Sequence, residues 1–317
     1  MTRRTDPLIV GACFTANTRR PDFERLKALA RSAERGTFAA LSFTEPPEQF
    51  EALTLMSALA AVTERIGLIA TPNDPEPYHI ARKLASLDHL SNGRAAWGVA
   101  SEPSSQRANE RHDLVNDLWD SWDDDAFIRD KASGRYFDPG KLHTLNHKGE
   151  HFSVRGPLNV ARPPQGHPLR VHTLASEADT ALTIRVADVI IAGHRDLPAA
   201  QAFYHDIKQH AAALGRNPEH LKILTTVNPL GSTPNDIAER FEQGFQTRAC
   251  DGFNLLFPDS TDAIDTFVEH VIPLLQHRGL LRHGYSGSTL REHLGLPRPS
   301  NRFSASILPV TEPAHAS

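Results

Sequence analysis

The sequence has few of the features that several large classes of protein require. It contains only two cysteines, Cys13 and Cys250, in 317 residues, which is too few for a disulfide scaffold or a cysteine-rich metal site. It has no apolar run that approaches the length of a transmembrane helix, since every hydrophobic stretch is interrupted within about ten residues. Its formal net charge of −4 favours neither a nucleic-acid backbone nor an anionic membrane. We therefore expect a globular protein without a metal site and without a nucleic-acid or membrane partner.

The first residues favour a cytoplasmic location. Arg3 and Arg4 are basic, but no apolar core of a signal peptide follows them. A twin-arginine export signal is the alternative, yet the chain soon enters a run typical of a first strand. Hydrophobic residues make up 39% and charged residues 23% of the chain, a balance that allows a large core in one or two domains.

Short β-branched runs alternate with longer amphipathic runs along most of the chain. This pattern is typical of parallel strands covered by helices. The eight expected strands span residues 8–14, 40–44, 66–71, 95–100, 169–174, 189–192, 221–227 and 253–257. Eight strands, each followed by a helix, are the number that closes an α/β fold into a TIM-type (β/α)₈ barrel. A doubly wound open sheet is the structural alternative, since the pattern alone does not exclude it.

The expected helices between these strands carry apolar residues at helical spacing. Four of them span residues 23–36, 53–62, 79–90 and 109–122. Two later ones present apolar faces formed by Phe203, Ile207, Ala211 and Leu214, and by Ile264, Phe267, Val271 and Leu275. Gly36 marks the end of the first helix, as a C-terminal glycine commonly does.

Regular alternation stops between residues 123 and 168. This segment is rich in Asp, Gly, Pro and His, with two short strands expected around 141–145 and 151–154. It is too long for a plain connection and predicts an excursion over one rim of the barrel. A single domain is expected over residues 1–297, and residues 298–317 are expected to form a loosely ordered tail.

Three histidines in the excursion recur every four residues. His143, His147 and His151 would form a metal-binding face on a helix. Gly149 and the strand-like run that begins at Phe152 argue against a helix there. A solvated hairpin is the favoured interpretation.

Other prominent residues also have structural interpretations. Trp119 and Trp122 are expected to anchor the core rather than to stack on a ligand. Arg155 and Arg162 flank a proline-rich segment and are candidates for an anion contact, with a surface salt bridge as the simpler alternative.

Several stretches resemble one known family. Residues 76–97 (EPYHIARKLASLDHLSNGRAAW), together with 118–134, 152–164, 251–256 and 289–299, are similar to the bacterial luciferase-like flavin-dependent monooxygenases. The similarity lies with the branch of nitrilotriacetate, EDTA and dibenzothiophene-sulfone monooxygenases. The stretches occur in the same order as in the family and span nearly the whole chain. The chain therefore resembles a shortened member of this family.

The resemblance implies a fold and a reaction. Members of this family are (β/α)₈ barrels that receive reduced FMN from a separate flavin reductase. They react it with O₂ to a flavin hydroperoxide and oxygenate a small organic substrate. The family also implies a homodimer or higher homo-oligomer, formed through helices near strands two to four. Because the flavin carries the chemistry, no catalytic side chain needs to be assigned.

The resemblance assigns four flavin contacts to the rim at the carboxyl ends of the strands, where barrels bind ligands. They are Glu45, Thr71, Ser101 and Ser176. Glu45 stands where the family usually has an aspartate. Ser176 is the one hydroxyl retained in the turn that holds the FMN phosphate in the family.

The same rim departs from the family at further positions. Gly98 stands where the family has an amide side chain near the flavin ring, and Leu174 and Ala175 replace part of the phosphate-binding turn. The loops after strands four and seven are shorter than in the family, with 228–231 passing straight to 233–234. These losses fall on the ligand-binding rim, whereas the scaffold motifs are kept.

Three further residues are candidate substrate contacts. Tyr78 and His79 begin the third helix and face the rim, and His194 follows the sixth strand. Helix packing, or a rim histidine without function, is the alternative for each.

Two other functions therefore stay open beside the monooxygenase. One is a non-catalytic luciferase-like subunit or a ligand-binding barrel that has lost flavin chemistry. The other is a barrel that uses a deazaflavin cofactor, as in related families.

Overall fold

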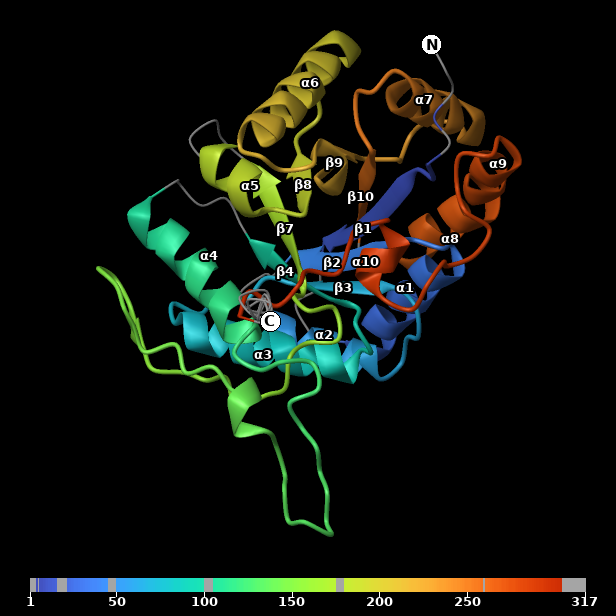
Figure 1. The fold of residues 1–317 in the computed structure, drawn as a ribbon. Helices are drawn as coiled ribbons and strands as arrows, with labels where there is room; N and C mark the ends of the chain where they lie inside the picture. Colours follow the sequence, from blue (N-terminus) through green and yellow to red (C-terminus); the bar gives the residue numbers. More distant parts are fainter. Residues whose placement is uncertain are drawn as a thin grey trace, which may run out of the picture.

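A closed ring of parallel strands forms the centre of the molecule (Figure 1). The computed structural model describes residues 4, 6–15, 22–44, 50–99, 105–174, 180–258 and 260–303. The eight strands follow the order β1-β10-β9-β8-β7-β4-β3-β2 around the barrel. They are β1 (Ile9–Thr15), β2 (Ala40–Thr44), β3 (Gly67–Ala70), β4 (Ala95–Val99), β7 (Leu169–Leu174), β8 (Val189–Ala192), β9 (Lys222–Val227) and β10 (Gly252–Pro258). The expected (β/α)₈ barrel is confirmed, and the open sheet is excluded.

Helices surround the barrel and cover its outer face (Figure 1). They are α1 (Phe23–Arg35), α2 (Ala52–Ala60), α3 (Pro77–Leu90), α4 (Gln106–Trp119), α5 (Thr180–Val186), α6 (Leu197–Ala213), α7 (Pro234–Gln246), α8 (Thr261–His270) and α9 (Ile272–His277). Side chains at their first residues fix where several of them begin. Thr233 and Asp236, for example, form a capping box at the start of α7, which satisfies two backbone N–H groups that the helix leaves free. No described helix has the length and apolar composition needed to cross a membrane.

Two expected helices differ from the structure in part, although the apolar residues Ile264, Phe267, Val271 and Leu275 are buried as predicted. Leu214 caps the end of α6 and is 57% exposed, so it does not join the buried face. The helix expected over 264–275 is broken, because α8 ends at His270 and α9 begins at Ile272 with Pro273 in its first turn. Proline lacks the N–H of a regular helix and clashes with the preceding turn, which explains the break.

The excursion leaves the body of the barrel as two extended arms (Figure 1). Its only ladder among the described residues pairs β5 (His147–Lys148) with β6 (Ser153–Val154) in antiparallel fashion. The strand expected at 141–145 is reduced to one antiparallel bridge between Leu142 and Trp122, directly after a 3₁₀ turn over Pro139–Lys141 that Asp138 caps. The strand expected at 151–154 is confirmed in its second half.

None of the three spaced histidines lies on a helix. His147 and His151 belong to the β5–β6 hairpin, and His143 precedes it. His147 Nε2 lies 2.8 Å from Glu110 Oε1, and Glu110 also accepts hydrogen bonds from the backbone of His151 and Phe152. His143 stacks on Phe303. The hairpin interpretation is confirmed, and within the described residues no group of three His, Cys, Asp or Glu side chains could hold a metal ion.

Buried polar contacts attach the excursion to the barrel. The Arg162 side chain is 1% exposed and lies 2.9 Å from Asp120, which also pairs with His167. The surface salt bridge expected for Arg162 was therefore wrong, because the partner carboxylate comes from the buried end of α4. Asn301 donates to the carbonyl groups of Asp120 and Trp122, so the described start of the expected tail, residues 298–303, is held in place.

The two tryptophans anchor the core as predicted. Trp119 is fully buried, and its indole N–H donates to Ala81 O at 3.0 Å. Trp122, which follows α4, donates to Leu158 O at 2.6 Å and so connects the helix to the excursion. Each ring contributes a large apolar area with its one polar group satisfied.

The motif at 76–97 is explained by structural hydrogen bonds. Asp88 is completely buried and accepts from the Gln165 amide at 2.6 Å and from Ala95 N at 3.2 Å. Burial raises its pKa to about 6, although the hydrogen bonds from Gln165 and Ala95 oppose the shift. Arg94 is 2% exposed and donates to four backbone carbonyl groups, those of Ala60, Thr63, Ile66 and Ser91. The motif therefore fixes how α3 meets β4.

The segment after α9 closes the amino-terminal end of the barrel. Its short helix α10 (Leu290–His293) places Leu290, with Leu294 and Leu296, in the same apolar cluster as the lower lumen. A Cβ on Gly67 would lie 2.6 Å from Leu290 Cδ1, so glycine at the start of β3 makes room for this floor. Arg291 pairs with Asp188 at 3.2 Å.

Candidate functional site

The side chains that face the lumen change in character from floor to mouth. Alternation along the strands points every second residue inward. The lower lumen is apolar, with Ile9, Ala40, Ala96, Val171, Ile191 and Leu224 in one cluster. Above this layer the same alternation places mostly small and polar side chains, with Leu256 of β10 as a large apolar one beside Cys13; the others are Cys13, Ser42, Thr71, Gly98, Thr173 and Thr226. Thr173 is exposed although it lies within β7, so the lumen opens at the carboxyl ends of the strands. We call this opening the mouth.

Thr71 and Gly98 occupy one position of the mouth together. Gly98 lies in β4, and Thr71 directly follows β3. A Cβ on Gly98 would overlap Thr71 Oγ1 and would lie 3.0 Å from Ile69 Cγ2. The Thr71 hydroxyl therefore fills the space that any side chain at position 98 would take.

Cys13 lies on β1, two strands from β3 around the barrel. Its neighbour across the β1–β2 ladder is Ser42, and the two side chains are hydrogen-bonded. Burial raises the pKa of the Cys13 thiol, and the bond from Ser42 opposes this only in part. The thiol is therefore protonated at neutral pH and does not act as a thiolate nucleophile.

The structure locates four of the seven residues predicted to bind ligands. Thr71 faces the mouth, as expected of a flavin contact. His194 is exposed two residues after the end of β8. Tyr78 and His79 lie in the first turn of α3. Glu45, Ser101 and Ser176 lie outside the described residues.

His79 is turned toward an outer groove. A cavity of about 760 Å³ between α2 and α3 is lined by Glu51, Arg82 and Lys83 as well as His79. His79 Nδ1 lies 3.6 Å from Asp74 Oδ2, and Lys83 donates to the same oxygen at 2.9 Å. Burial opposes ionisation of Asp74, but the hydrogen bonds from Lys83 and the Glu76 backbone lower its pKa. The structure thus brings Thr71 and Gly98 together in the mouth and places the His79 ring outside it.

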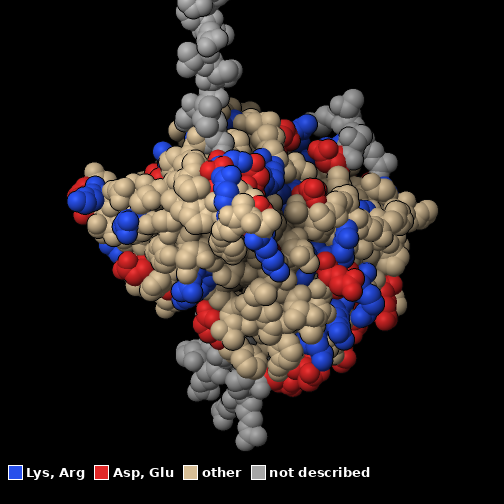
Figure 2. All heavy atoms as spheres, turned by 60° about the horizontal axis from the view of Figure 1, so that its bottom comes forward, with Lys and Arg blue, Asp and Glu red and all other residues tan. Residues whose placement is uncertain are grey.

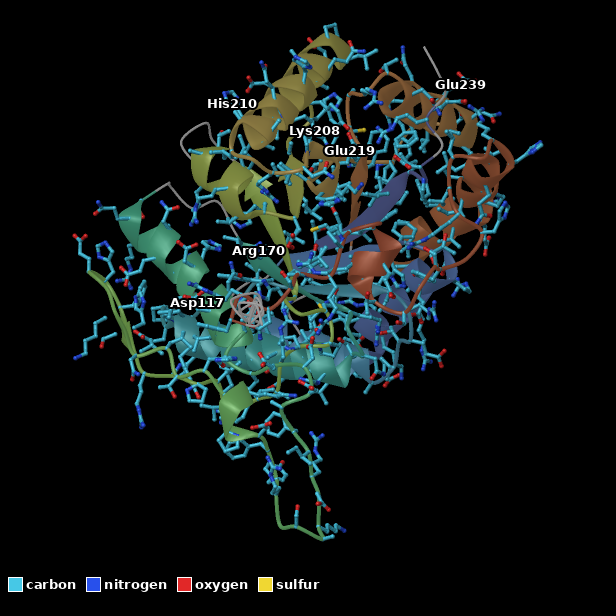
Figure 3. All side chains as sticks on the ribbon, viewed as in Figure 1. Asp117, Arg170, Lys208, His210, Glu219 and Glu239 are labelled. Carbon is cyan, nitrogen blue, oxygen red and sulfur yellow. The ribbon has the colours of Figure 1, made fainter. Side chains whose placement is uncertain are left out.

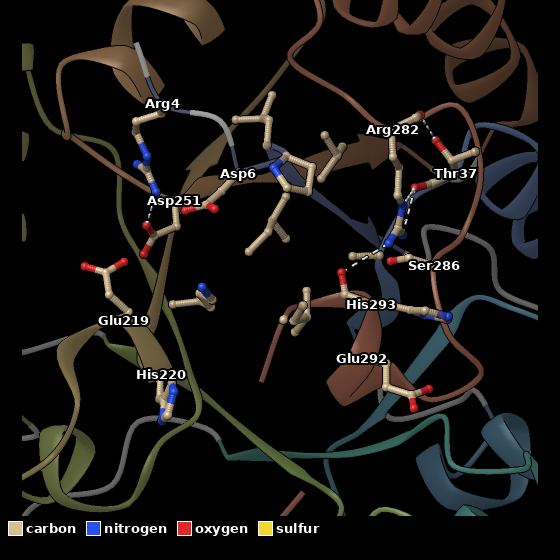
Figure 4. A pocket seen from close by; sticks show the side chains of 18 residues that line it. Arg4, Asp6, Thr37, Glu219, His220, Asp251, Arg282, Ser286, Glu292 and His293 are labelled. Carbon is tan, nitrogen blue, oxygen red and sulfur yellow. Dashed lines mark hydrogen bonds and ion pairs between the residues drawn. The ribbon is translucent and has the colours of Figure 1, made fainter. Parts of the chain in front are cut away.

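A second cavity lies at the opposite, amino-terminal face of the barrel (Figure 4). It has a volume of about 450 Å³ and contains Arg4, Asp251 and Lys222 in its wall. Arg4 pairs with Asp251 at 2.8 Å, and the Tyr204 hydroxyl donates to the same carboxylate at 2.9 Å. Because these groups already satisfy one another, and because the amino-terminal face of a barrel serves stability, we assign no chemistry to this cavity.

The Asp251 carboxylate also contacts α6, through Lys208. Lys208 projects from α6 toward the start of β9, near Glu219 (Figure 3). Its ammonium donates to Pro218 O and Leu221 O and lies 3.3 Å from Asp251 Oδ2. Burial lowers the pKa of Lys208, and Asp251 opposes that shift. This is a structural network distant from the mouth.

Charge on the visible surface is mixed. Figure 2 shows basic and acidic side chains interspersed over this face, with no extended patch of one sign. Such a surface gives no electrostatic guidance toward a polyanionic partner.

A family model described as luciferase-like monooxygenase matches residues 10–246 of the chain. N-acetyl-S-(2-succino)cysteine monooxygenase of Bacillus subtilis (strain 168) is 34% identical, and the match covers 89% of this chain and 92% of that protein. Nitrilotriacetate monooxygenase component A of Aminobacter aminovorans is 36% identical over 83% of this chain and 82% of that protein. The solved EDTA monooxygenase from Chelativorans sp. BNC1 superimposes with a TM-score of 0.80 at 25% identity, covering 92% of this chain and 99% of that one.

One relative also matches this chain in length. It is a subunit of the pristinamycin IIA synthase of Streptomyces pristinaespiralis and is 36% identical, with 95% of this chain and 98% of that protein covered by an alignment of 315 positions. The alignment with the Bacillus protein extends over 405 positions, more than the 317 residues of this chain. The Bacillus relative therefore contains segments that this chain lacks.

Proposed function

This chain belongs to the luciferase-like monooxygenase family, and from that premise we propose that it is an FMNH₂-dependent monooxygenase of the two-component type. Reduced FMN comes from a separate flavin reductase, and the oxygenated substrate is a small organic molecule. The observation that supports this best is a lumen that is apolar below and lined mostly by small and polar side chains at its mouth. Gly98 has no side chain, which lets the Thr71 hydroxyl approach β4 closely at this mouth.

The residues of this chain hold and shield the ligand rather than react with it. Bound reduced FMN would supply the oxygen chemistry. Thr71 contributes a hydroxyl at the mouth, and Glu45, Ser101 and Ser176 are further proposed flavin contacts. The apolar lower lumen and the leucine floor exclude water from below.

Substrate contacts are proposed at the rim. Tyr78 and His194 are proposed contacts because they follow β3 and β8, whose carboxyl ends form the rim. His79 is the third proposed contact, although its ring lies beside Asp74 in the outer groove. The cytoplasm, where a reductase has access to reduced nicotinamide, is the proposed location.

Flavin binding tests the proposed function directly. We expect saturable binding of FMN, and of reduced FMN under anaerobic conditions, measured by the change in flavin fluorescence and absorbance. Adding a flavin reductase, NADH and O₂ should then convert a substrate related to those of the relatives, such as nitrilotriacetate. If the folded protein binds neither oxidised nor reduced FMN, the proposed enzymatic function is rejected.

A non-catalytic subunit is the second candidate function. The relative that matches this chain in length is named as one subunit of a synthase, whereas the Bacillus relative is longer. This candidate predicts a stable fold without flavin affinity, so the titration separates it from the enzyme.

Self-association is proposed to occur through the helices near β2 to β4. The outer surfaces of α2 and α3 form the groove that contains Glu51 and Arg82. We expect light scattering to give the mass of a dimer, or of a higher homo-oligomer, at micromolar concentration. A mass near 35.0 kDa over a wide concentration range would contradict this.

A further inference from the structure

A buried amide faces the lumen without a partner among the described residues. Asn254 lies in β10 and is 5% exposed. Its neighbours Phe253 and Leu255 point outward into the core under the helices, where Phe253 stacks on Phe241 of α7. Alternation therefore turns Asn254 inward, and its Oδ1 lies 3.3 Å from the place a Cβ on Gly11 would take. No hydrogen bond joins this amide to another described residue.

A second polar group lies beside it. The backbone of Asn254 pairs with Thr226 of β9 and with Gly11 of β1. Thr226 also points inward and is half-buried, and its hydroxyl has no hydrogen-bond partner in the described part of the chain. Adjacent strands are about 4.8 Å apart, so the amide and the hydroxyl lie side by side in the lumen, below the mouth. Gly11 has no side chain, so the Asn254 amide packs directly beside the β1 backbone.

The Asn254 amide differs from the apolar side chains of the lower lumen. Nearly all buried polar groups in proteins are paired with protein or with ordered water, whereas this amide faces the lumen without a partner among the described residues. The lower layer of the lumen is apolar, so packing alone does not require an amide at position 254. A polar side chain at such a place is accounted for when a ligand binds it.

We propose that Asn254, with Thr226, binds a group that carries a hydrogen-bond donor next to an acceptor, that is, an amide or imide edge that reaches down from the mouth. This inference rests on the proposed function. Two ligands carry such an edge, namely the imide of the flavin ring and the N-acetyl amide of a substrate. An ordered water molecule is the structural alternative.

Two variants at position 254 test the role of the amide. Asn254→Leu keeps a similar branched shape without hydrogen bonds, and Asn254→Ala cannot overfill the lumen. We expect both proteins to fold with a melting temperature that Asn254→Leu leaves unchanged or raises. The dissociation constant of the ligand should increase about tenfold, which is the loss of one hydrogen bond. Thr226→Val should weaken binding in the same direction, and Thr225→Val, on the outward face of the same strand, should not.

The choice of probe identifies the source of the edge. Titrations use FMN, N3-methyl-FMN, in which a methyl group replaces the imide proton, and N-acetyl-S-(2-succino)cysteine added to the FMN-saturated protein. If the flavin provides the edge, wild type prefers FMN to the N3-methyl compound and Asn254→Leu loses that preference. If the substrate provides the edge, Asn254→Leu binds FMN as wild type does but binds the N-acetyl compound more weakly.

Two results would count against the proposal. Folded variants that bind FMN and the N-acetyl compound as wild type does would overturn it. The same holds if FMN binding is unchanged and wild type does not bind the N-acetyl compound. A lower melting temperature in both variants with unchanged binding would assign the amide to the fold or to a bound water. Failure of wild type to bind FMN at all would instead overturn the proposed function, and this inference with it.

Discussion

Replacing Asp188 by asparagine is expected to lower the free energy of unfolding by about 3 kcal/mol, because one partner of a buried ion pair is lost while the other stays. Asp188 precedes β8 and is 7% exposed. It pairs with Arg291 of the floor at 3.2 Å and accepts from Arg170 N at 2.8 Å. The variant would leave the Arg291 guanidinium buried without a counter-charge. Urea unfolding at pH 7 measures the effect.

The same carboxylate predicts a pH dependence. Burial alone would raise the pKa of Asp188, but Arg291 and Arg170 outweigh it and lower the pKa to about 2. The ordinary value is about 3.9. A lowered folded-state pKa gives stability that is present above about pH 4 and is lost as the pH falls toward 2. Wild type and Asp188→Asn should therefore converge in stability across that interval.

An exposed carboxylate provides the control for this pair. Asp206 pairs with His210 on the surface of α6, where both side chains are more than half exposed. Asp206→Asn should change stability by less than about 0.5 kcal/mol at any pH. Equal losses in the two asparagine variants would show that Asp188 has no special role.

Adding one methyl group at Gly98 is expected to destabilise the protein by about 1–3 kcal/mol, as overpacking does. The added Cβ would overlap the Thr71 hydroxyl and approach Ala70 O to 3.2 Å. The direction of the change in stability is informative, because replacing a strand glycine by alanine at an unhindered site usually increases stability. Since Thr71 must move, we also expect FMN affinity to fall about tenfold, the equivalent of one hydrogen bond.

A double-mutant cycle isolates this contact. Thr71→Ala removes the overlapping oxygen, so the Thr71→Ala/Gly98→Ala protein should recover more than half of the stability lost by Gly98→Ala. Gly193→Ala, on the same rim after β8, is the matched control, because a Cβ there has nothing within 4 Å. Thermal unfolding and FMN titration of the four proteins provide the data. Additive losses in the cycle would mean that the two residues are not coupled.

The barrel itself was predictable from local sequence. Each strand is a short β-branched run bounded by turn residues, and its start and end were correct to within one residue or two. Parallel strands buried on both faces leave this signal because both faces need apolar residues. The excursion leaves no such signal, and of the strand expected at 141–145 only the bridge between Leu142 and Trp122 forms, after a 3₁₀ turn.

Long-range partners were beyond local sequence reasoning. The partner of Arg162 is Asp120, 42 residues away, and no spacing rule connects them. The floor is similar, since Leu290 reaches β3 from the far end of the chain. Asn254 was within reach, because a lone polar residue between Phe253 and Leu255 points to the opposite face from both. Its significance becomes clear only once the barrel closes.

The leucine floor lies across one end of the barrel. Leu290, Leu294 and Leu296 pack into the lower lumen, so among the described residues the route to the depth of Asn254 runs past Thr71 and Thr173. A ligand bound near these two threonines would therefore slow both the entry and the release of a molecule bound below it.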